Sequence, residues 1–480
     1  MADPTKTLPQ VAIPLPDRKK LAVQIGCICM MLSVAMYGLV FSTLTSPILE
    51  GINASGYVSL FSIFAALGVS TMTPIGGKLS DIIGRRNIVV IPGLVCALAG
   101  LLFPFVHSLV PLMALRLIIS LAQGMFTAAP YIIVSLINER KDVPKAMGML
   151  AAAISVGGFG GSIIAGFLTD RGMMTAAILM PAIPLLAGVA LIGLNLPNVK
   201  REGKIAIDWA GIVLLIAALC GILLALNFGS SVGFGNTKVI LALVLGIIAL
   251  FALIVVENKV KEPLIPLRLF KNSQYALLLL IGFICYFYQN AMNVYAPIAV
   301  LRVMEGTTTV AGSLQLPRTI ICMILPTICG AWVGKKVTNL WKAMAIATLF
   351  VAIPFAFLGM TTPATSVLVF MVGLGLTGIA EGFRSVSITP AAQALLAPED
   401  MGIGTSLVNF FNSLSGTVAA AAFGVAYNLN TAADPGNPAN IQKGVNTVFQ
   451  LAALISLIGF VLVIFLVRPM MNKKATTANE

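Results

Sequence analysis

Four ionisable side chains lie well inside long apolar stretches of this sequence, where a charge is costly unless it has a partner or faces water. They are Arg116, Arg318, Glu381 and Arg384. Glu381 and Arg384 are three residues apart, so on a helix they share a face and can form an ion pair. Burial disfavours the charged form of a carboxyl and a neighbouring guanidinium favours it, so Glu381 is a candidate for loading and releasing a proton. The alternative is a purely structural ion pair.

Arg116 and Arg318 have no acidic neighbour in the sequence. One interpretation is that each pairs with backbone carbonyls or extends its long side chain toward the membrane surface. The other is that they give an internal cavity a positive potential. A positive cavity would suit an anionic substrate.

Uncharged polar residues recur on one face of the apolar stretch 274–298. They are Tyr286, Gln289, Asn290 and Asn293. Their spacing of three, four and seven residues puts them on one side of a helix. Such a face should contact protein or water rather than lipid, so we predict that it lines a cavity, with hydrogen bonding between helices as the alternative. Asn409 and Asn412 form a smaller pair of the same kind.

The residues of known catalytic and metal sites are not grouped in this sequence. His107 is the only histidine, and the seven cysteines all fall within apolar runs, in an odd number that argues against a disulfide framework. The phosphate-binding pattern G-x-x-x-x-G-K-[ST] does not occur. We therefore expect no enzyme activity, no cofactor and no metal.

Composition identifies the kind of element that must position these side chains. The chain has 480 residues, of which 58% are hydrophobic and 10% charged, whereas soluble proteins have about 25% charged residues. We predict an all-α polytopic membrane protein that has the lipid bilayer as its partner. The net charge of +13 could suggest nucleic acid, but the charges lie in short loops between apolar segments, so we expect no nucleic-acid partner.

Apolar runs long enough to cross a bilayer recur fourteen times. They lie near 21–46, 57–77, 88–107, 110–137, 145–169, 173–196, 208–228, 237–257, 274–298, 308–333, 340–360, 364–394, 403–427 and 444–467. With the N-terminus inside, most of the 30 Lys and Arg residues fall in cytoplasmic loops and tails. The external loops hold only Arg171, Lys238, Arg302 and Lys443. This distribution predicts that both termini lie in the cytoplasm, and we expect a multi-pass protein of the inner (cytoplasmic) membrane.

The loop after the second run carries a specific motif. Residues 77–86 read G-K-L-S-D-I-I-G-R-R. This resembles the signature G-x-L-x-D-x-x-G-R-[RK] of the major facilitator superfamily, with every fixed position met. We expect Gly77 and Gly84 to allow a sharp turn and close backbone approach. We also expect Asp81, Arg85 and Arg86 to hold a cytoplasmic gate.

A weaker copy of this motif follows the tenth run. Residues 330–336 read G-A-W-V-G-K-K, with Gly334 at the aspartate position. The copy predicts a repeat of six helices, if two linker helices are set aside. The expected domains are an N-terminal six-helix bundle (1–200), two linker helices (201–262) and a C-terminal six-helix bundle (263–480). Transporters built from repeats have their substrate site near the bilayer midplane, so we expect the linker helices to be dispensable for it.

Further motifs are similar to those of the fourteen-helix drug:proton antiporter branch of this superfamily. The antiporter motif G-x8-G-x3-G-P-x2-G-G is matched by Gly148, Gly157, Gly161 and Gly166, with Ser162 and Ala165 as departures. Plain packing of small residues between helices is the alternative.

Other segments typical of this branch open the seventh span, follow the eighth and lie in the tenth. They are Asp208-Trp209, the stretch 261–272, and Ala311-Gly312 with Pro317.

Two departures from this branch bear on the substrate. Gly38 stands where the first helix usually has an aspartate, and Thr43 where it has an asparagine. In the fourth helix the pattern R-x-x-Q-G is displaced, so that Gln123 is seven residues after Arg116, on the same helix face.

The resemblance implies a proton-coupled secondary transporter of a small amphipathic molecule, and we expect a monomer. Because three intramembrane arginines accompany one glutamate, we favour an organic anion as the substrate. A bile acid is one candidate, since bile-acid transporters of anaerobic gut bacteria are similar fourteen-helix carriers. The first alternative is a multidrug:proton antiporter that exports lipophilic compounds. The second is a non-transporting membrane receptor on the same scaffold.

Overall fold

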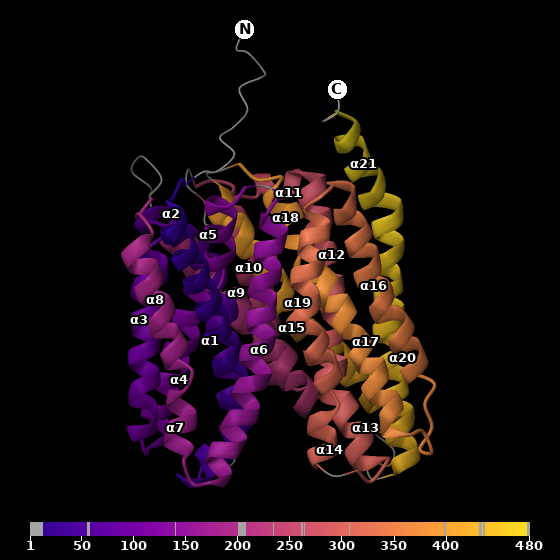
Figure 1. Cartoon of the computed structure of the whole chain (residues 1–480). Helices are drawn as coiled ribbons and strands as arrows, with labels where there is room; N and C mark the ends of the chain where they lie inside the picture. The colour runs from indigo at the N-terminus through magenta and orange to yellow at the C-terminus, as the bar shows by residue number, and fades with distance from the viewer. Residues whose placement is uncertain are drawn as a thin grey trace.

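The computed structural model of the chain describes residues 13–54, 58–139, 141–199, 208–233, 235–260, 263, 265–306, 308–397, 400–431, 434 and 437–477. All elements of regular secondary structure within these ranges are helices. The bundle has two ends (Figure 1). We call the end at which α1 begins and α21 lies the terminus end, and the opposite one the far end.

The N-terminal half consists of α1 to α8. These elements are α1 (Asp17–Glu50), α2 (Val58–Ile83), α3 (Asn87–Leu102), η2 (Phe103–Phe105), α4 (Leu109–Phe126), α5 (Ala129–Ile137), α6 (Val143–Asp170), α7 (Met174–Leu179) and α8 (Ala182–Asn195). Two further helices follow, α9 (Trp209–Val232) and α10 (Thr237–Glu257).

The C-terminal half consists of α11 to α21. Its elements are α11 (Arg268–Lys271), α12 (Ser273–Asn290), η3 (Ala291–Tyr295), α13 (Ala296–Arg302), α14 (Thr308–Ser313), α15 (Leu316–Val333), α16 (Thr338–Leu358), α17 (Val367–Ser385), α18 (Ile388–Gln393), α19 (Met401–Thr431), α20 (Pro438–Leu462), η5 (Val463–Val467) and α21 (Arg468–Thr477).

Thirteen helical segments of the described chain are long and apolar enough to cross a membrane. They match the predicted spans in order, except that α2 is not among them. α2 has 26 residues and joins the far end of α1 to the start of α3. Because α1 begins and α21 ends at the same end of the bundle, an even number of crossings is required (Figure 1). We keep fourteen spans as the prediction, with α2 as the second.

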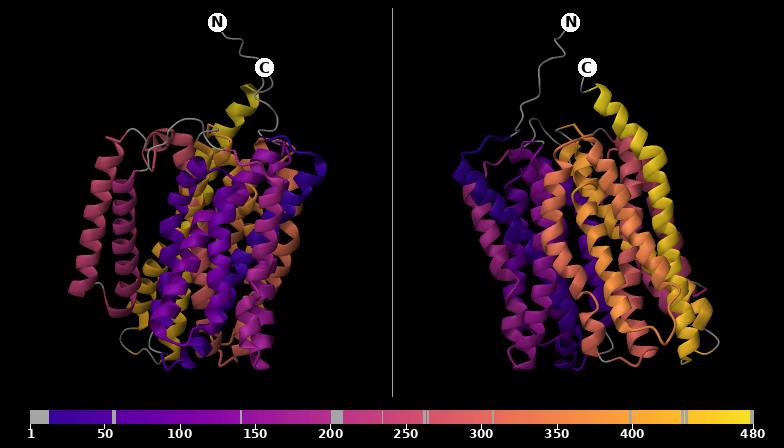
Figure 2. Two further views of the ribbon diagram at one scale, coloured as in Figure 1. Left: turned by 90° about the vertical axis from the view of Figure 1, so that its left-hand side faces the viewer. Right: turned by 45° about the vertical axis from the view of Figure 1, so that its right-hand side comes forward.

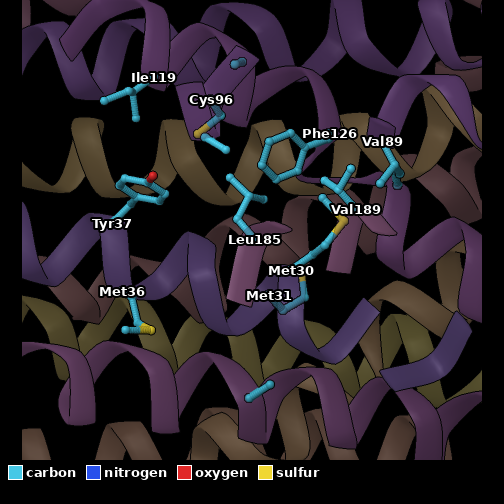
Figure 3. Packing of buried hydrophobic residues seen from close by; sticks show 14 of the residues in the cluster. Met30, Met31, Met36, Tyr37, Val89, Cys96, Ile119, Phe126, Leu185 and Val189 are labelled. Carbon is cyan, nitrogen blue, oxygen red and sulfur yellow. The ribbon is translucent and has the colours of Figure 1, made fainter. Parts of the chain in front are cut away.

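Each half has its own apolar core. One cluster joins residues from α1 through α8, and Tyr37, Cys96 and Leu185 lie together in it (Figure 3). A second cluster is built from α12 to α20, with edge-to-face aromatic contacts such as that between Phe355 and Phe449. Burial of these apolar side chains stabilises the packing within each half.

The linker helices α9 and α10 pack closely on each other, because Gly221 and Gly246 let their backbones approach. The pair lies beside the bundle in the left view of Figure 2. α9 contacts both α2 and α19, and its Leu215 is buried, whereas Leu245 of α10 is 56% exposed. Lipid therefore covers the outer face of this pair.

The signature motif is more helical than the sequence predicts. α2 continues through Ile83, so Gly77 lies inside the helix and makes no turn. The turn falls at Gly84, whose φ is +97°, a conformation that glycine adopts without strain. The prediction of a turn at Gly77 was wrong because the helical backbone persists six residues beyond the predicted apolar run 57–77.

Candidate functional site

The centre of the site is a buried ion pair on α17. Arg384 Nε lies 2.9 Å from Glu381 Oε2, and Arg384 Nη2 lies 2.5 Å from Oε1. The two side chains are only 12% and 15% exposed. A two-pronged contact between a guanidinium and a carboxylate is among the stronger polar interactions in proteins. The i, i+3 pair expected from the sequence is therefore present in the structure.

Arg318 of α15 joins this pair from a neighbouring helix. Its Nη2 lies 3.7 Å from Glu381 Oε2 and 3.4 Å from Tyr288 Oη. The sequence indicated no partner for Arg318. In the structure, Arg318 and Arg384 share the carboxylate of Glu381. We call Arg318, Glu381 and Arg384 the charge cluster. It holds two guanidiniums and one carboxylate, so it carries a net positive charge when all three are ionised.

Helix α12 supplies uncharged partners to the cluster. Tyr288 Oη and Gln289 Nε2 each lie 3.5 Å from Glu381 Oε2, and the guanidinium of Arg384 stacks over the ring of Tyr286 at 4.8 Å. Tyr288 is not one of the four residues of the predicted polar face. The structure makes it the bridge between Arg318 and Glu381.

The helix does not keep one regular period through the predicted polar face. Residues 291–295 form the π-helical turn η3, which changes the rotation of the residues that follow. Asn290 is half-buried, while Asn293 is exposed and its Oδ1 accepts a hydrogen bond from Gln315 Nε2 at 3.0 Å. Tyr286 and Gln289 therefore meet the cluster, whereas Asn293 is directed to α15 near the far end.

Arg116 lies in the other half, away from the charge cluster. It is 6% exposed, and its guanidinium lies 4.6 Å from the ring centre of Phe41 and 5.1 Å from that of Phe61. Its Nε has no hydrogen-bond partner in the described chain. Stacking on aromatic rings stabilises the cation. The sequence singled out Arg116 but gave no sign of its two phenylalanines.

Three amide side chains near the middle of the bundle each have a buried atom that forms no hydrogen bond within the described chain. These atoms are Gln123 Nε2, Asn409 Nδ2 and Asn412 Oδ1. Asn412 Oδ1 lies toward α12, 3.4 Å from where a Cβ on Gly282 would be. Buried polar atoms are nearly always paired in native proteins, so these amides are suited to hydrogen-bond water or a ligand.

The two halves meet at the terminus end through glycines. A Cβ on Gly77 of α2 would collide with the side chain of Ser406 on α19. On the other side of the bundle, a Cβ on Gly330 of α15 would collide with the carbonyl of Pro144 at the start of α6. We call these two glycine contacts the terminus-end gate. The signature motif and its degraded copy therefore both contribute a close contact between the halves at the terminus end, and the role of these contacts as a gate stays a prediction.

Neighbouring residues extend the gate on the α6–α15 side. Gly334 packs against the carbonyl of Lys141, and Gly148 against that of Pro326. In the turn before α6, Lys141 Nζ lies 2.8 Å from Glu139 Oε2, and its hydrogen bond lowers the pKa of Glu139. Because this pair is on the surface, it contributes little to stability. The close backbone contacts of Gly334 and Gly148 therefore contribute more to this interface than the ion pair does.

The end of the signature motif is held by residues that the sequence did not single out. Asn198 Oδ1 accepts hydrogen bonds from the backbone N–H groups of Arg86 and Asn87 at 3.3 and 3.4 Å. Its Nδ2 donates to Ile83 O at 3.0 Å, while Arg85 Nη1 donates to Ser80 Oγ at 2.6 Å. The side chain of Asp81 lies outside the described residues, so its predicted pairing in the gate stays a prediction.

We expect Asp81→Asn to insert into the membrane normally and to transport poorly. The substitution removes the charge that we predict to brace the closed gate, while it conserves the shape of the side chain. Transport by reconstituted protein, normalised to the amount inserted, measures the effect. A wild-type rate in this variant would exclude a gating role for Asp81.

The glycines of α6 differ in their surroundings. Gly157 packs against the backbone of Leu32, and Gly161 lies against Met36, both on α1. At Gly166 a Cβ would meet nothing within 4 Å, so the structure gives this position no close packing. Ser162, which replaces the proline of the antiporter motif, lies 2.7 Å from Thr43 on α1, oxygen to oxygen.

Comparison with known proteins identifies the class to which this fold and site belong. The family model of the Major Facilitator Superfamily matches residues 26–420, so the chain belongs to that superfamily and is a multi-pass membrane transporter. The multidrug transporter protein MdtP of Bacillus subtilis is 27% identical over 408 residues, which cover 84% of this chain and 74% of the relative. The riboflavin transporter RibZ of Clostridioides difficile is 23% identical over 82% of this chain and 85% of its own.

Some relatives are much longer than this chain. An uncharacterized MFS-type transporter of Mycobacterium tuberculosis, Rv1877, is 23% identical over 75% of this chain but only 52% of its own length. Two solved structures share the fold at low identity. The human organic anion transporter MFSD10 has a TM-score of 0.62 at 15% identity, and a bacterial homologue of the iron transporter ferroportin, in an outward-facing state, has 0.63 at 14%; each match covers 93% of this chain and 99% of the other.

Proposed function

We propose that this transporter couples protons to the movement of a small amphipathic organic anion, with bile acids as candidate substrates. The observation that supports the proposal is the charge cluster, in which Glu381 is shared by Arg318 and Arg384. Because two buried guanidiniums share one carboxylate, their charge is only partly neutralised, and they are suited to bind a second anion. The apolar walls of the bundle would accommodate the rest of an amphipathic molecule.

Proton and anion binding would be linked through Glu381. When Glu381 is ionised it occupies both guanidiniums, and an incoming carboxylate or sulfonate must compete with it. When Glu381 is protonated, Arg318 and Arg384 are free to bind the substrate anion. Protonation would therefore raise the affinity for the anion, and by linkage the anion would raise the affinity for the proton.

The first alternative is a multidrug:proton antiporter, and the relatives favour it. MdtP is a multidrug transporter, and another relative, 23% identical, is the multidrug resistance protein 3 of Bacillus subtilis. An exporter of lipophilic cations would require protonation to weaken substrate binding. The two proposals therefore predict opposite signs of the pH effect on affinity. A receptor on the same scaffold would bind a ligand without moving it.

A screen of labelled ligands in proteoliposomes, with a pH gradient imposed, tests these proposals. We expect organic anions with an apolar body to be moved, and neutral or cationic amphipaths of the same size to be moved poorly. Preferred movement of lipophilic cations would support the multidrug alternative instead. Binding without movement of either kind would support the receptor.

We propose further that the chain works as a monomer in the inner membrane with the terminus end in the cytoplasm. The distribution of Lys and Arg residues supports this orientation. Labelling of engineered tags at each terminus in intact cells and in inverted vesicles tests it. In this orientation the closed gate faces the cytoplasm.

A further inference from the structure

A groove runs along the outer surface of the N-terminal half, between α3 and α8, at the terminus end. It has a volume of about 370 Å³ and is lined by Arg86, Asn87, Val90, Val189, Ala190, Gly193 and Leu194. α3 and α8 lie side by side at the edge of the bundle (Figure 1). The groove is separate from the charge cluster, which lies in the C-terminal half.

The lining residues are arranged in two zones. Arg86 and Asn87 stand at the start of α3, at the terminus end, and the rest of the lining is apolar. Val90 lies about one helical turn deeper than Arg86, some 5 Å toward the middle of the membrane, and Val189 packs against Gly93, about one turn deeper again. Leu194 at the rim is 84% exposed. The groove is therefore polar at the terminus end and apolar toward the middle of the membrane, as the lipid headgroup and acyl-chain regions of a bilayer are.

The positive charge at the mouth has no acidic partner in the described part of the chain. Within the described residues, the guanidinium of Arg86 makes one hydrogen bond, from its Nε to Asn87 Oδ1 at 3.5 Å. The backbone N–H groups of Arg86 and Asn87 are already bonded to Asn198, so the guanidinium remains as the available donor. The positive end of the α3 helix dipole adds to the attraction for an anion.

We propose that this groove binds an anionic glycerophospholipid, with its phosphate on Arg86 and the upper part of one acyl chain along Val90, Val189 and Leu194. A guanidinium binds phosphate with two parallel hydrogen bonds, and basic pockets between membrane helices bind anionic lipid headgroups. The apolar zone opens to the bilayer, so the ligand is a lipid rather than a free phosphate. The lipid would contact the signature motif at Arg86, two residues after the turn at Gly84.

Native mass spectrometry of the delipidated full-length protein tests this, with equal amounts of phosphatidylglycerol and phosphatidylcholine that have the same acyl chains. We expect one phosphatidylglycerol to bind in preference, by about tenfold, since one charge-assisted contact contributes that much. Arg86→Gln should lose the preference. Gly193→Leu should weaken binding of both lipids, because a Cβ on Gly193 already comes within 3.2 Å of Val90.

Matched controls separate the groove from the rest of the surface. Arg171→Gln removes an arginine at the far end that stacks on Phe167, and Gly166→Leu adds a side chain in open space; both should bind phosphatidylglycerol as the wild type does. If Arg86→Gln does not purify as a single species, Gly193→Leu and Ala190→Phe test the groove with Arg86 intact. Soluble glycerol phosphate should not displace the lipid.

Three results would overturn the proposal. The first is unchanged phosphatidylglycerol binding in both Arg86→Gln and Gly193→Leu. The second is equal binding of the two lipids by the wild type. The third is full displacement by glycerol phosphate, which would make the site one for a free phosphate and leave the apolar zone without a role.

Discussion

With Glu381 replaced by Gln, the protein should still bind and exchange its anionic substrate, but it should no longer accumulate that substrate when a pH gradient is imposed. Glutamine conserves the shape of the side chain and fixes it in a neutral state, so no proton can be loaded or released there. For one coupled proton, each pH unit of gradient supplies about 1.4 kcal/mol, or roughly tenfold accumulation. Accumulation in proteoliposomes should therefore disappear in the variant.

Glu305→Gln is the matched control, because Glu305 is an exposed carboxylate in the same half. It should accumulate substrate as the wild type does. If Glu381→Gln also accumulates substrate with unchanged pH dependence, Glu381 is only the structural partner of the two arginines. The proton would then be carried by the substrate itself or by another group.

The second large effect is expected for Gly330→Leu, which should prevent the terminus-end gate from closing. The new side chain would collide with the carbonyl of Pro144, a backbone atom that cannot rotate away. Overpacking of this kind costs about 1–3 kcal/mol, which corresponds to roughly a 5- to 150-fold shift in the populations of the two states. Hydrogen exchange at the first turns of α6 should rise, and transport should fall in proportion.

Gly166→Leu serves as the control for this variant. It makes the same change on α6 at a position where a Cβ meets nothing within 4 Å. It should leave hydrogen exchange at the start of α6 unchanged. Normal exchange at the first turns of α6 in Gly330→Leu, with normal transport, would show that this glycine contact does not form the gate.

The ion pair between Glu381 and Arg384 could be predicted because both residues are on one helix, where spacing determines geometry. The contribution of Arg318 could not, since it depends on how α15 packs against α17. The terminus-end gate could likewise be predicted only in part. The motif and its copy were visible in the sequence, but the contacts of Gly330 with Pro144 and of Gly77 with Ser406 join segments far apart in the chain.

Departures from regular helix geometry limited the prediction of the polar face on α12. A 3.6-residue period holds through Tyr286 and Gln289, and the π-helical turn at 291–295 then changes the direction of Asn293. Helix length was also underestimated for α2, because hydropathy detects the apolar part of a helix and not its polar last turns. Arg116 was identified by its charge, but its stabilisation by Phe41 and Phe61 arises from apolar residues that look like ordinary core.

The most direct test of the account is the dissociation constant of an amphipathic sulfonate as a function of pH, measured on the wild type and on Glu381→Gln. A sulfonate stays ionised throughout, so any pH dependence belongs to the protein. We predict that the wild type binds it more tightly as the pH falls, while Glu381→Gln binds it tightly at every pH. Binding by the wild type that weakens on acidification, or that does not change with pH, would contradict the coupling of proton and anion at the charge cluster.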